Sequence, residues 1–327
     1  MKNVLITGGT GFIGSNLAAR LVELGYNVRI LRRDNSDLRA IQGIDVEHCI
    51  GDLRDHESVR RAVMGSDTVF HAAAIVTFAR KKRELQLAVN VGGTTNVVEA
   101  CLAKGIERLI HTSSVAAIGY PHAGEIATET TPFNWPRTMG YKFSKYESEQ
   151  VVLGGVARGL NAVIVNPSVV IGERDIHMHG GQLIKEVKRG LVPFYIDGGM
   201  NVAYVGDVVN GHILAAQKGR TGERYILSGL NMTHKEIFRR TAELVGGRSP
   251  FMKLPIPMLR LAAGIVEKAS RLFDVEPLIS SDLVAGAGLY NWVSSEKAQR
   301  ELGYTVTPFD ETILAAFRWY VQNGFLR

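Results

Sequence analysis

The feature that most constrains the fold is a glycine-rich turn near the N-terminus. It occurs in Val4-Leu5-Ile6-Thr7-Gly8-Gly9-Thr10-Gly11-Phe12-Ile13-Gly14, which contains both G-x-G-x-x-G and G-x-x-G-x-x-G. An apolar run typical of a buried strand, Val4–Thr7, precedes the glycines, and a helical pattern, Phe12–Leu24, follows them. In this context the backbone can approach a pyrophosphate, whose charge then lies at a helix N-terminus. We therefore expect a dinucleotide to bind at Gly8, Gly11, Phe12, Ile13 and Gly14.

The first half of the chain continues with short apolar runs that alternate with amphipathic stretches. Strands are predicted at Val28–Leu31, Val46–Ile50, Thr68–His71, Leu109–Thr112 and Ala162–Val165, and helices at His56–Met64, Glu84–Ala103 and Tyr141–Ala157. Continuous apolar strands separated by helices indicate a parallel sheet that is covered on both faces. The sequence thus predicts an α/β fold with a doubly wound parallel sheet of the Rossmann type.

The pattern loosens after Pro167. A helix is predicted at Gln182–Lys188, strands at Val202–Val205 and Arg224–Leu227, and helices at His234–Val245, Met258–Phe273 and Asp310–Asn323. The length of 327 residues suggests about two domains. We expect residues 1–170 and 201–227 to form the dinucleotide-binding domain, and residues 171–200 and 228–327 to form a smaller, mainly helical substrate-binding cap.

The ends of the second, third and fourth strands bear on which dinucleotide binds. NAD-selective sites place an acid about 20 residues after the glycines, but here Arg32 and Arg33 follow the strand and Asp34 comes two residues late. Guanidinium groups suit a 2′-phosphate, so NADP(H) is favoured, and NAD(H) stays possible. Asp52, followed by Leu53, can accept a hydrogen bond from an adenine amino group. The small residues Ala72 and Ala73 let the backbone approach the cofactor.

A tyrosine and a lysine with helical spacing carry the catalytic signal. Tyr141 and Lys145 are four residues apart, so on a helix they share one face, ~6 Å apart along the axis. A phenol with a pKa near 10 is a poor acid–base catalyst at neutral pH, and a neighbouring ammonium favours its ionisation. Thr112 and Ser114 end the fifth strand, at the carboxyl edge where such sheets bind ligands. A serine hydroxyl there can polarise a substrate carbonyl.

Taken in order, these motifs resemble an extended short-chain dehydrogenase/reductase of the epimerase/dehydratase superfamily. The dihydroflavonol 4-reductase-like branch, with its hopanoid-associated sugar epimerase-like proteins, is the most similar. The resemblance rests on Thr7–Gly14, Gly51-Asp52-Leu53, His71–Ala74, Asn90, Thr112–Ser114, Tyr141 with Lys145, Asn166-Pro167-Ser168, Gly222–Leu227 and Glu301–Tyr304.

The resemblance assigns roles to residues of this chain. It implies that Ser114, Tyr141 and Lys145 are the catalytic triad, and that Asp52 lies at the adenine. It also implies that Pro167 and Val169 lie near the nicotinamide, and that Asn90 and Thr112 face the cofactor region. One departure is Tyr204-Val205-Gly206-Asp207-Val208, where relatives often carry His-Val-Asp-Asp-Val. This departure puts in doubt a detail of substrate binding or of the contact between the domains.

Composition removes several other classes of protein. With 46% hydrophobic residues and no uncharged apolar stretch near ~20 residues, neither a disordered chain nor a membrane-spanning protein is expected. Cys49 and Cys101 lack metal-type spacing, His177 and His179 have no further ligands nearby, and we expect no metal. The basic run Arg80–Arg83 has no aromatic interleaving, which argues against nucleic acid. We expect a cytoplasmic monomer or homodimer.

The sequence therefore predicts an NADP(H)-dependent oxidoreductase. It would reduce a ketone or aldehyde, or oxidise the alcohol, of a mid-sized and fairly apolar small molecule. A nucleotide-sugar epimerase or dehydratase and a 3β-hydroxysteroid (sterol) dehydrogenase are the alternatives, and a regulator without turnover is disfavoured by the intact Ser–Tyr–Lys set. The Met258–Phe273 pattern suits a helix that covers an apolar substrate, and peripheral contact with a membrane is the second interpretation.

Overall fold

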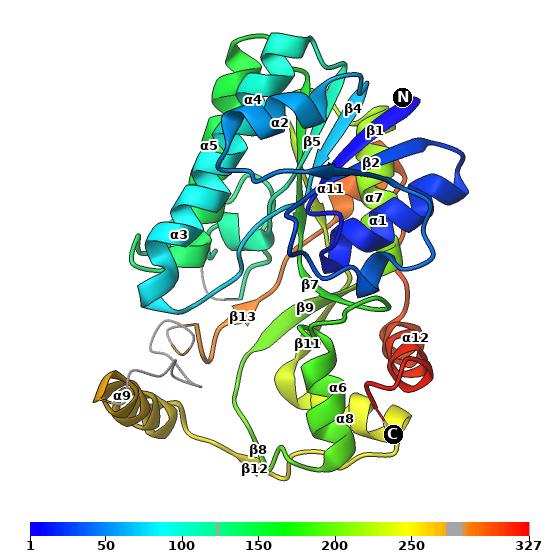
Figure 1. Cartoon of the computed structure of the whole chain (residues 1–327). Helices are drawn as coiled ribbons and strands as arrows, with labels where there is room; N and C mark the ends of the chain where they lie inside the picture. Colours follow the sequence, from blue (N-terminus) through cyan, green and yellow to red (C-terminus); the bar gives the residue numbers. More distant parts are fainter. Residues whose placement is uncertain (122–123, 273–283, 285, 327) are drawn as a thin grey trace.

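The computed structural model describes residues 1–121, 124–272, 284 and 286–326, with the backbone alone for Arg80 and residues 267–272. Seven parallel strands form the large sheet, in the order β10–β6–β5–β4–β1–β2–β3 (Figure 1). Their bounds are β1 Asn3–Thr7, β2 Asn27–Arg32, β3 Glu47–Ile50, β4 Thr68–His71, β5 Arg108–Thr112, β6 Ala162–Pro167 and β10 Arg224–Leu227. The strand order reverses between β1 and β4, which confirms the doubly wound α/β fold.

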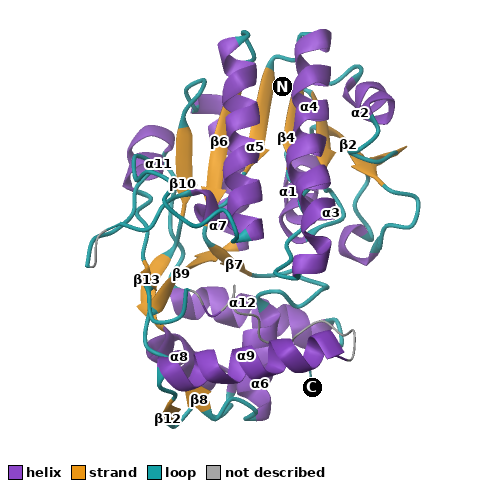
Figure 2. Cartoon of the chain, turned by 90° about the vertical axis from the view of Figure 1, so that its left-hand side faces the viewer, coloured by secondary structure: helices purple, strands orange, loops and turns teal. Residues whose placement is uncertain are grey.

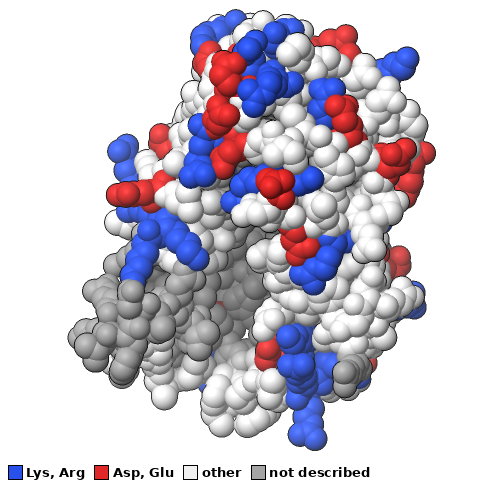
Figure 3. Space-filling model, in the orientation of Figure 1, with Lys and Arg blue, Asp and Glu red and all other residues white. Residues whose placement is uncertain are grey.

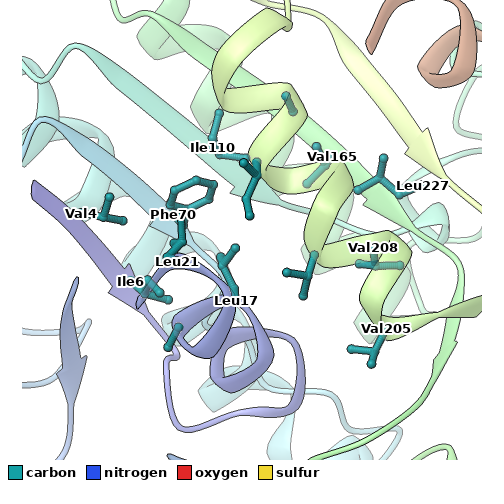
Figure 4. Close-up of a cluster of buried hydrophobic side chains, with 14 of the residues drawn as sticks. Val4, Ile6, Leu17, Leu21, Phe70, Ile110, Val165, Val205, Val208 and Leu227 are labelled. Carbon is teal, nitrogen blue, oxygen red and sulfur yellow. The ribbon is translucent and has the colours of Figure 1, made fainter. Parts of the chain in front are cut away.

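Helices cover both faces of this sheet, as Figure 2 shows from the side. One layer contains α2 (His56–Val63), α3 (Arg83–Leu87), α4 (Gly93–Lys104) and α5 (Gly140–Ala157), and the other contains α1 (Phe12–Glu23), α7 (Val205–Lys218) and α11 (Glu296–Leu302). Apolar residues of α1 and α7, such as Leu17 and Val208, pack on Ile6, Phe70 and Ile110 of the strands (Figure 4). The central strands are therefore buried on both sides, which explains their continuous apolar runs, whereas the edge strand β3 is largely exposed.

A smaller lobe lies beyond the carboxyl ends of these strands (Figure 1). Its sheet contains β7 (Val169–Ile171), β9 (Gly199–Tyr204), β11 (Leu230–Thr233) and β13 (Tyr290–Asn291), and β8 (Phe194–Tyr195) pairs with β12 (Met252–Lys253) as a two-stranded ribbon. The helices are α6 (Gly181–Arg189), α8 (His234–Val245), α9 (Ile256–Leu272) and α12 (Phe309–Gln322). Ile184, Ile237, Ile313 and Tyr320 are buried in the core of this lobe, which we call the cap.

The structure differs from the sequence-based expectations in several places. The predicted helix Glu84–Ala103 is interrupted by a π-helical turn, η3 (Ala88–Gly92), between α3 and α4. The helices α7 and α11 were not predicted, and residues 201–204 lie in the cap sheet as part of β9, whereas α11 packs on the large-sheet lobe. Val205 begins α7 rather than ending a strand. Phe273, the last residue of the predicted helix Met258–Phe273, lies outside the described residues.

Short helical turns complete the large-sheet lobe: η1 (Arg39–Ile41), η2 (Arg80–Lys82) and η4 (Val115–Ala117). Because the strands are parallel, the segments that follow β1, β4, β5 and β6 meet at one edge, facing the cap. This edge brings the glycine turn, Ala72 and Ser114 to the same side of the sheet. Within the part of the chain that the structure describes, we find no helix with the length and apolar character that a bilayer crossing requires.

Candidate active site

The glycine turn between β1 and α1 is packed closely against the end of β4. Gly8 has a φ of +73°, and a Cβ at this position would lie 2.7 Å from the Cα and N atoms of Ala73. The Gly11 amide donates a 2.9 Å hydrogen bond to the Gly8 carbonyl, and α1 begins at Phe12 with no acidic residue in its first turn. A turn without side chains and a helix N-terminus without negative charge fit a cofactor pyrophosphate. Ile13 and Gly14, in the first turn of α1, would form part of this binding site.

Arg32 lies at the end of β2, where the ribose of a dinucleotide is expected. Its Nε donates to His48 Nδ1 at 2.8 Å, and its Nη1 donates to the carbonyls of Arg33 and Asp34 at 3.1 and 3.2 Å. These bonds hold the guanidinium at the strand end, while the side chain of Arg33 is exposed. The arrangement offers positive charge at the position where an NAD-selective site has an acid.

Asp52 has a partner that the sequence analysis did not foresee. Its carboxylate accepts from Arg54 Nε and Nη2 at 3.0 and 2.8 Å, and this hydrogen bonding lowers the pKa of Asp52 to about 2. The carboxylate is therefore ionised, and its remaining lone pairs can serve an adenine amino group. The neighbouring Leu53 is buried, and its carbonyl accepts a hydrogen bond from Asn96 Nδ2 at 2.7 Å.

Asn90 is buried in the π-helical turn and uses both ends of its amide within the protein. Its Oδ1 accepts from the Ile75 amide at 2.8 Å, and its Nδ2 donates to the Ile75 carbonyl and to Ser144 Oγ, both at 3.0 Å. Ser144 in turn donates to the carbonyl of Tyr141 at 2.8 Å. Asn90 therefore links the loop after β4 to the first turn of α5, which the resemblance alone did not indicate.

Ser114, Tyr141 and Lys145 come together where β5 meets α5. The Ser114 hydroxyl lies close enough to Tyr141 to influence the ionisation of its phenol. Ser114 also accepts from the Ala116 amide at 3.1 Å, which fixes the serine at the start of η4. Lys145, with only 4% of its surface exposed, donates from Nζ to the carbonyl of Thr112 at 2.8 Å. The structure thus places the three predicted catalytic residues in one site.

Burial controls the ionisation of this group. Burial raises the pKa of the Tyr141 phenol, and the hydrogen bond from Ser114 opposes that rise to a smaller extent. The sequence-based expectation of a lowered phenol pKa is therefore reversed by the chain's own residues, which keep the phenol protonated. Burial also lowers the pKa of Lys145 to about 8, and the charge of Glu149 acts in the opposite direction.

A buried carboxylate beneath the site was missed by the sequence analysis. Glu149 is fully buried on α5, accepts from Asn166 Nδ2 at 2.6 Å and forms an ion pair with Arg224 Nε at 3.2 Å. Tyr141, Lys145 and Glu149 are spaced by four residues, so they share one helix face, and this spacing was the signal that could have revealed the glutamate.

Two buried histidines also lie close enough to Lys145 for its charge to affect their pKa values. Burial lowers the pKa of His71 to about 3, and burial likewise holds the pKa of His111 well below its usual value. Both rings are therefore neutral at physiological pH. The two histidines therefore add no positive charge to that of Lys145 and of Arg224, which pairs with Glu149.

A cavity of about 990 Å³ lies between the two lobes, where the space-filling view shows a hollow (Figure 3). Ser114 and Tyr141 line its inner wall. The remaining wall is mainly apolar and aromatic, with Phe78, Ile118, Tyr120, Trp135, Met139, Val169, Phe194, Tyr195, Ile196, Met200, Phe238, Leu254, Leu259 and Trp292. Among the described lining residues the charged ones are Arg83 and Lys142, and none is acidic.

Lys142 follows Tyr141 and was not singled out from the sequence. Its Nζ lies 2.8 Å from the centre of the Trp135 ring, and burial lowers its pKa to about 7. Of the two residues that the resemblance placed near the nicotinamide, Pro167 ends the buried strand β6. Val169 begins β7 and lies on the cavity wall.

Comparison with known proteins agrees with this geometry. Residues 4–228 match the model of the NAD dependent epimerase/dehydratase family. The chain belongs to this family. The family comprises NAD(P)-dependent oxidoreductases of the extended short-chain dehydrogenase/reductase type, and the chain is therefore an enzyme of that class.

Similar family members span nearly the whole chain. A Synechocystis protein provisionally named dihydroflavonol 4-reductase is 34% identical, over 98% of this chain and 95% of its own length. Sterol demethylase protein B of Methylococcus capsulatus is 30% identical, over 98% and 99%. A solved structure titled as a nucleoside-diphosphate-sugar epimerase from Pseudomonas aeruginosa superposes with a TM-score of 0.83 and 26% identity, over 100% and 99% of the two chains.

In the segment Tyr204–Val208, the side chain of Asp207 contacts another part of the chain. Asp207 accepts hydrogen bonds from the Thr307 amide at 2.6 Å and from Thr307 Oγ1 at 2.9 Å. It therefore connects α7 to the segment between α11 and α12. Asp207 is not among the described residues that line the cavity.

Proposed function

We propose that this family member is an NADP(H)-dependent oxidoreductase that interconverts a ketone and an alcohol on a mid-sized, fairly apolar substrate. The observation that carries the proposal is that Ser114 and Tyr141 lie together on the wall of a large, mainly apolar cavity. A cavity of about 990 Å³ is at the upper end of the roughly 300–1,000 Å³ typical of small-molecule sites. This size suits a polycyclic substrate better than a small sugar or acid.

The roles of the three side chains follow from their environments. Tyr141 is protonated, so it can donate its proton to a substrate oxygen on which negative charge develops. Ser114 offers a second hydrogen bond to the same oxygen, and these fixed donors stabilise charge that water would otherwise solvate. Lys145 places its ammonium at the end of β5, where it stabilises the phenolate left after proton transfer and can hold a ribose hydroxyl. In the oxidative direction the same groups remove the proton.

The cofactor part of the proposal rests on the glycine turn and on Arg32. When bound, the nicotinamide cofactor supplies or accepts a hydride, which the side chains of the chain cannot do. Gly8, Gly11 and the α1 N-terminus fit the pyrophosphate, and the Arg32 guanidinium at the end of β2 favours a ribose 2′-phosphate. Asp52 would accept from the adenine amino group.

Two relatives support a sterol-like substrate by their names. Sterol demethylase protein B is described above, and the protein named 3 beta-hydroxysteroid dehydrogenase/Delta 5→4-isomerase of Mycobacterium tuberculosis is 32% identical, over 93% of this chain and 86% of its own length. The apolar cavity wall agrees with such a substrate. A nucleotide sugar is the second candidate, because Arg83 and Lys142 offer two cations that a diphosphate requires.

A substrate panel tests the proposal. The purified chain would be incubated with a 3-ketosteroid, a dihydroflavonol and a UDP-hexose, each with NADPH and with NADH, while nicotinamide absorbance and products are followed. We expect absorbance loss with the ketosteroid or the flavonoid, faster with NADPH. Isomerised sugar without absorbance change would instead establish the epimerase function.

A further inference from the structure

The helix α9 presents apolar side chains on two opposite faces. Its inner face includes Leu259 and Ala263, which pack against Val284 and Ala287, and Leu259 lines the cavity. Its outer face carries Met258, Leu261 and Ile265, with 59%, 68% and 61% of their surfaces exposed. These three positions follow the i, i+3, i+7 spacing of one helix face. A helix at the surface of a soluble protein normally has polar residues there, so α9 has an apolar face that the described chain leaves uncovered.

The exposed apolar surface continues into the residues that precede the helix. Phe251 is 77% exposed and Met252 is 50% exposed at the edge of the β8–β12 ribbon. In Figure 1 the ribbon lies at the lower end of the cap and α9 at its left side, joined by a short stretch of chain. We call the side chains of Phe251, Met252, Met258, Leu261 and Ile265 the α9 surface. Several large apolar side chains exposed within one short segment mark an interaction site more often than an ordinary surface.

The charges of the same segment have one sign. Between Leu244 and Val266 the chain has Arg248, Lys253 and Arg260 and no acidic residue. Arg248 and Arg260 are exposed and form no ion pair with the residues that the structure describes, while Lys253 pairs with Asp197 at 2.6 Å. Figure 3 shows Lys and Arg side chains at the lower end of the cap. Apolar side chains flanked by unpaired cations complement a partner that has an apolar interior beneath an anionic surface.

We propose that the α9 surface binds peripherally to a bilayer that contains anionic phospholipid. The apolar side chains would enter the acyl boundary, and Arg248 and Arg260 would contact lipid phosphates. A second copy of this chain is a poorer occupant, because a symmetric contact would bring the cations of both copies together without acids to oppose them. The proposal concerns binding and does not depend on the reaction described above.

The position of α9 gives this binding a consequence for the cavity. The inner face of the same helix forms part of the cavity wall, so a membrane-bound α9 would place that wall next to the lipid. An apolar substrate dissolved in the bilayer could then reach Ser114 and Tyr141 without crossing bulk water.

Vesicle sedimentation tests the proposal with the full chain and without any substrate. Vesicles of phosphatidylcholine with phosphatidylglycerol would be compared with vesicles of phosphatidylcholine alone, at low and high salt. We expect binding to the anionic vesicles that weakens with salt, and at least about tenfold weaker binding for Leu261→Glu/Ile265→Glu and for Arg248→Glu/Arg260→Glu. Leu24→Glu is the matched control, because Leu24 is 45% exposed at the end of α1 in the other lobe and should leave binding unchanged.

Three outcomes would overturn the proposal. The first is that the wild-type chain does not sediment with anionic vesicles. The second is that both double variants sediment like the wild type. The third is that the wild type binds no vesicles and forms a dimer in gel filtration, which Leu261→Glu/Ile265→Glu converts to a monomer. Thermal unfolding identifies a variant that has lost its fold. If Leu261→Glu/Ile265→Glu is unfolded, the vesicle binding of Arg248→Glu/Arg260→Glu, in which both substituted positions are exposed, tests the proposal. Because turnover is not measured, an inactive enzyme would leave this result unaffected.

Discussion

Replacement of Gly8 by alanine is the prediction that follows most directly from the geometry of the glycine turn. Gly8 has a φ of +73°, a conformation that costs a non-glycine residue about 1–2 kcal/mol. The new Cβ would also lie 2.7 Å from the Ala73 backbone and 2.9 Å from the Ala72 carbonyl carbon. Since both neighbours are backbone atoms of β4 and its loop, the strain adds about 1–3 kcal/mol. We therefore expect Gly8→Ala to lower the free energy of unfolding by about 2–5 kcal/mol.

Gly25→Ala separates the two contributions. Gly25 has a φ of +81°, but a Cβ there would meet nothing within 4 Å, so this variant should lose only about 1–2 kcal/mol. The effect of alanine on the unfolded chain is the same in both variants and cancels in the comparison. Urea unfolding measures the two free energies, and fluorescence titration with NADPH and NADH measures cofactor binding.

The cofactor titration tests whether the turn holds a nucleotide. A backbone displaced by the Gly8 side chain would misplace the amides of the turn, so we expect Gly8→Ala to bind cofactor about tenfold more weakly or worse, and Gly25→Ala to bind normally. Equal losses of stability in the two variants would refute the close packing of Gly8 on β4. Normal cofactor binding by a folded Gly8→Ala would refute the assignment of the turn to the pyrophosphate.

Three further predictions concern the site itself. Tyr141→Phe should lower kcat by about 10²–10⁴-fold with cofactor affinity retained, as measured by steady-state kinetics and titration, and near-normal turnover would eliminate Tyr141 as proton donor. Arg32→Asp should reverse the preference for NADPH over NADH, and equal affinity of the wild type for the two cofactors would remove the argument from Arg32. Glu149→Gln removes the anion that stabilises the Lys145 ammonium, whose pKa is about 8. Reduction requires the protonated lysine, so the alkaline decline in kcat/KM should begin at lower pH, and an unchanged pH profile would show that Glu149 does not act on Lys145.

Local sequence patterns predicted the seven strands of the large sheet and most of its helices, but not α7 or α11. Strands β1, β4, β5 and β6 are largely buried on both faces, so their apolar runs are continuous, and the turn at Gly8 requires a residue that tolerates positive φ. Tyr141 and Lys145 were identifiable because helical spacing places them on one face. Glu149 has the same spacing. A single acid four residues after a lysine is common on exposed helices, so the spacing alone did not identify Glu149 as part of the site.

The cap could be derived only in part: its helices α6, α8, α9 and α12 were predicted from their periodicity, but the pairing of its strands was not. Its strands contain two to six residues and come from distant parts of the chain, as when Tyr290 of β13 pairs with Gly199 of β9. Pairing between such short segments is decided by long-range packing, which leaves no periodic signal in the sequence. The partner of Asp52 and the amide contacts of Asn90 also depend on side chains that local patterns do not orient.

The most direct test of the proposed chemistry is transfer of a labelled hydride. The wild-type chain and Tyr141→Phe would be incubated with a ketosteroid and with NADPH carrying deuterium at the nicotinamide C4 position, and the alcohol would be analysed by mass spectrometry. We expect one deuterium per molecule of alcohol with the wild type, and at least about 100-fold less labelled product with Tyr141→Phe. Labelled alcohol formed equally fast by both proteins would eliminate Tyr141 as the proton donor, and a wild type that labels no ketone but isomerises a nucleotide sugar would overturn the proposed reaction.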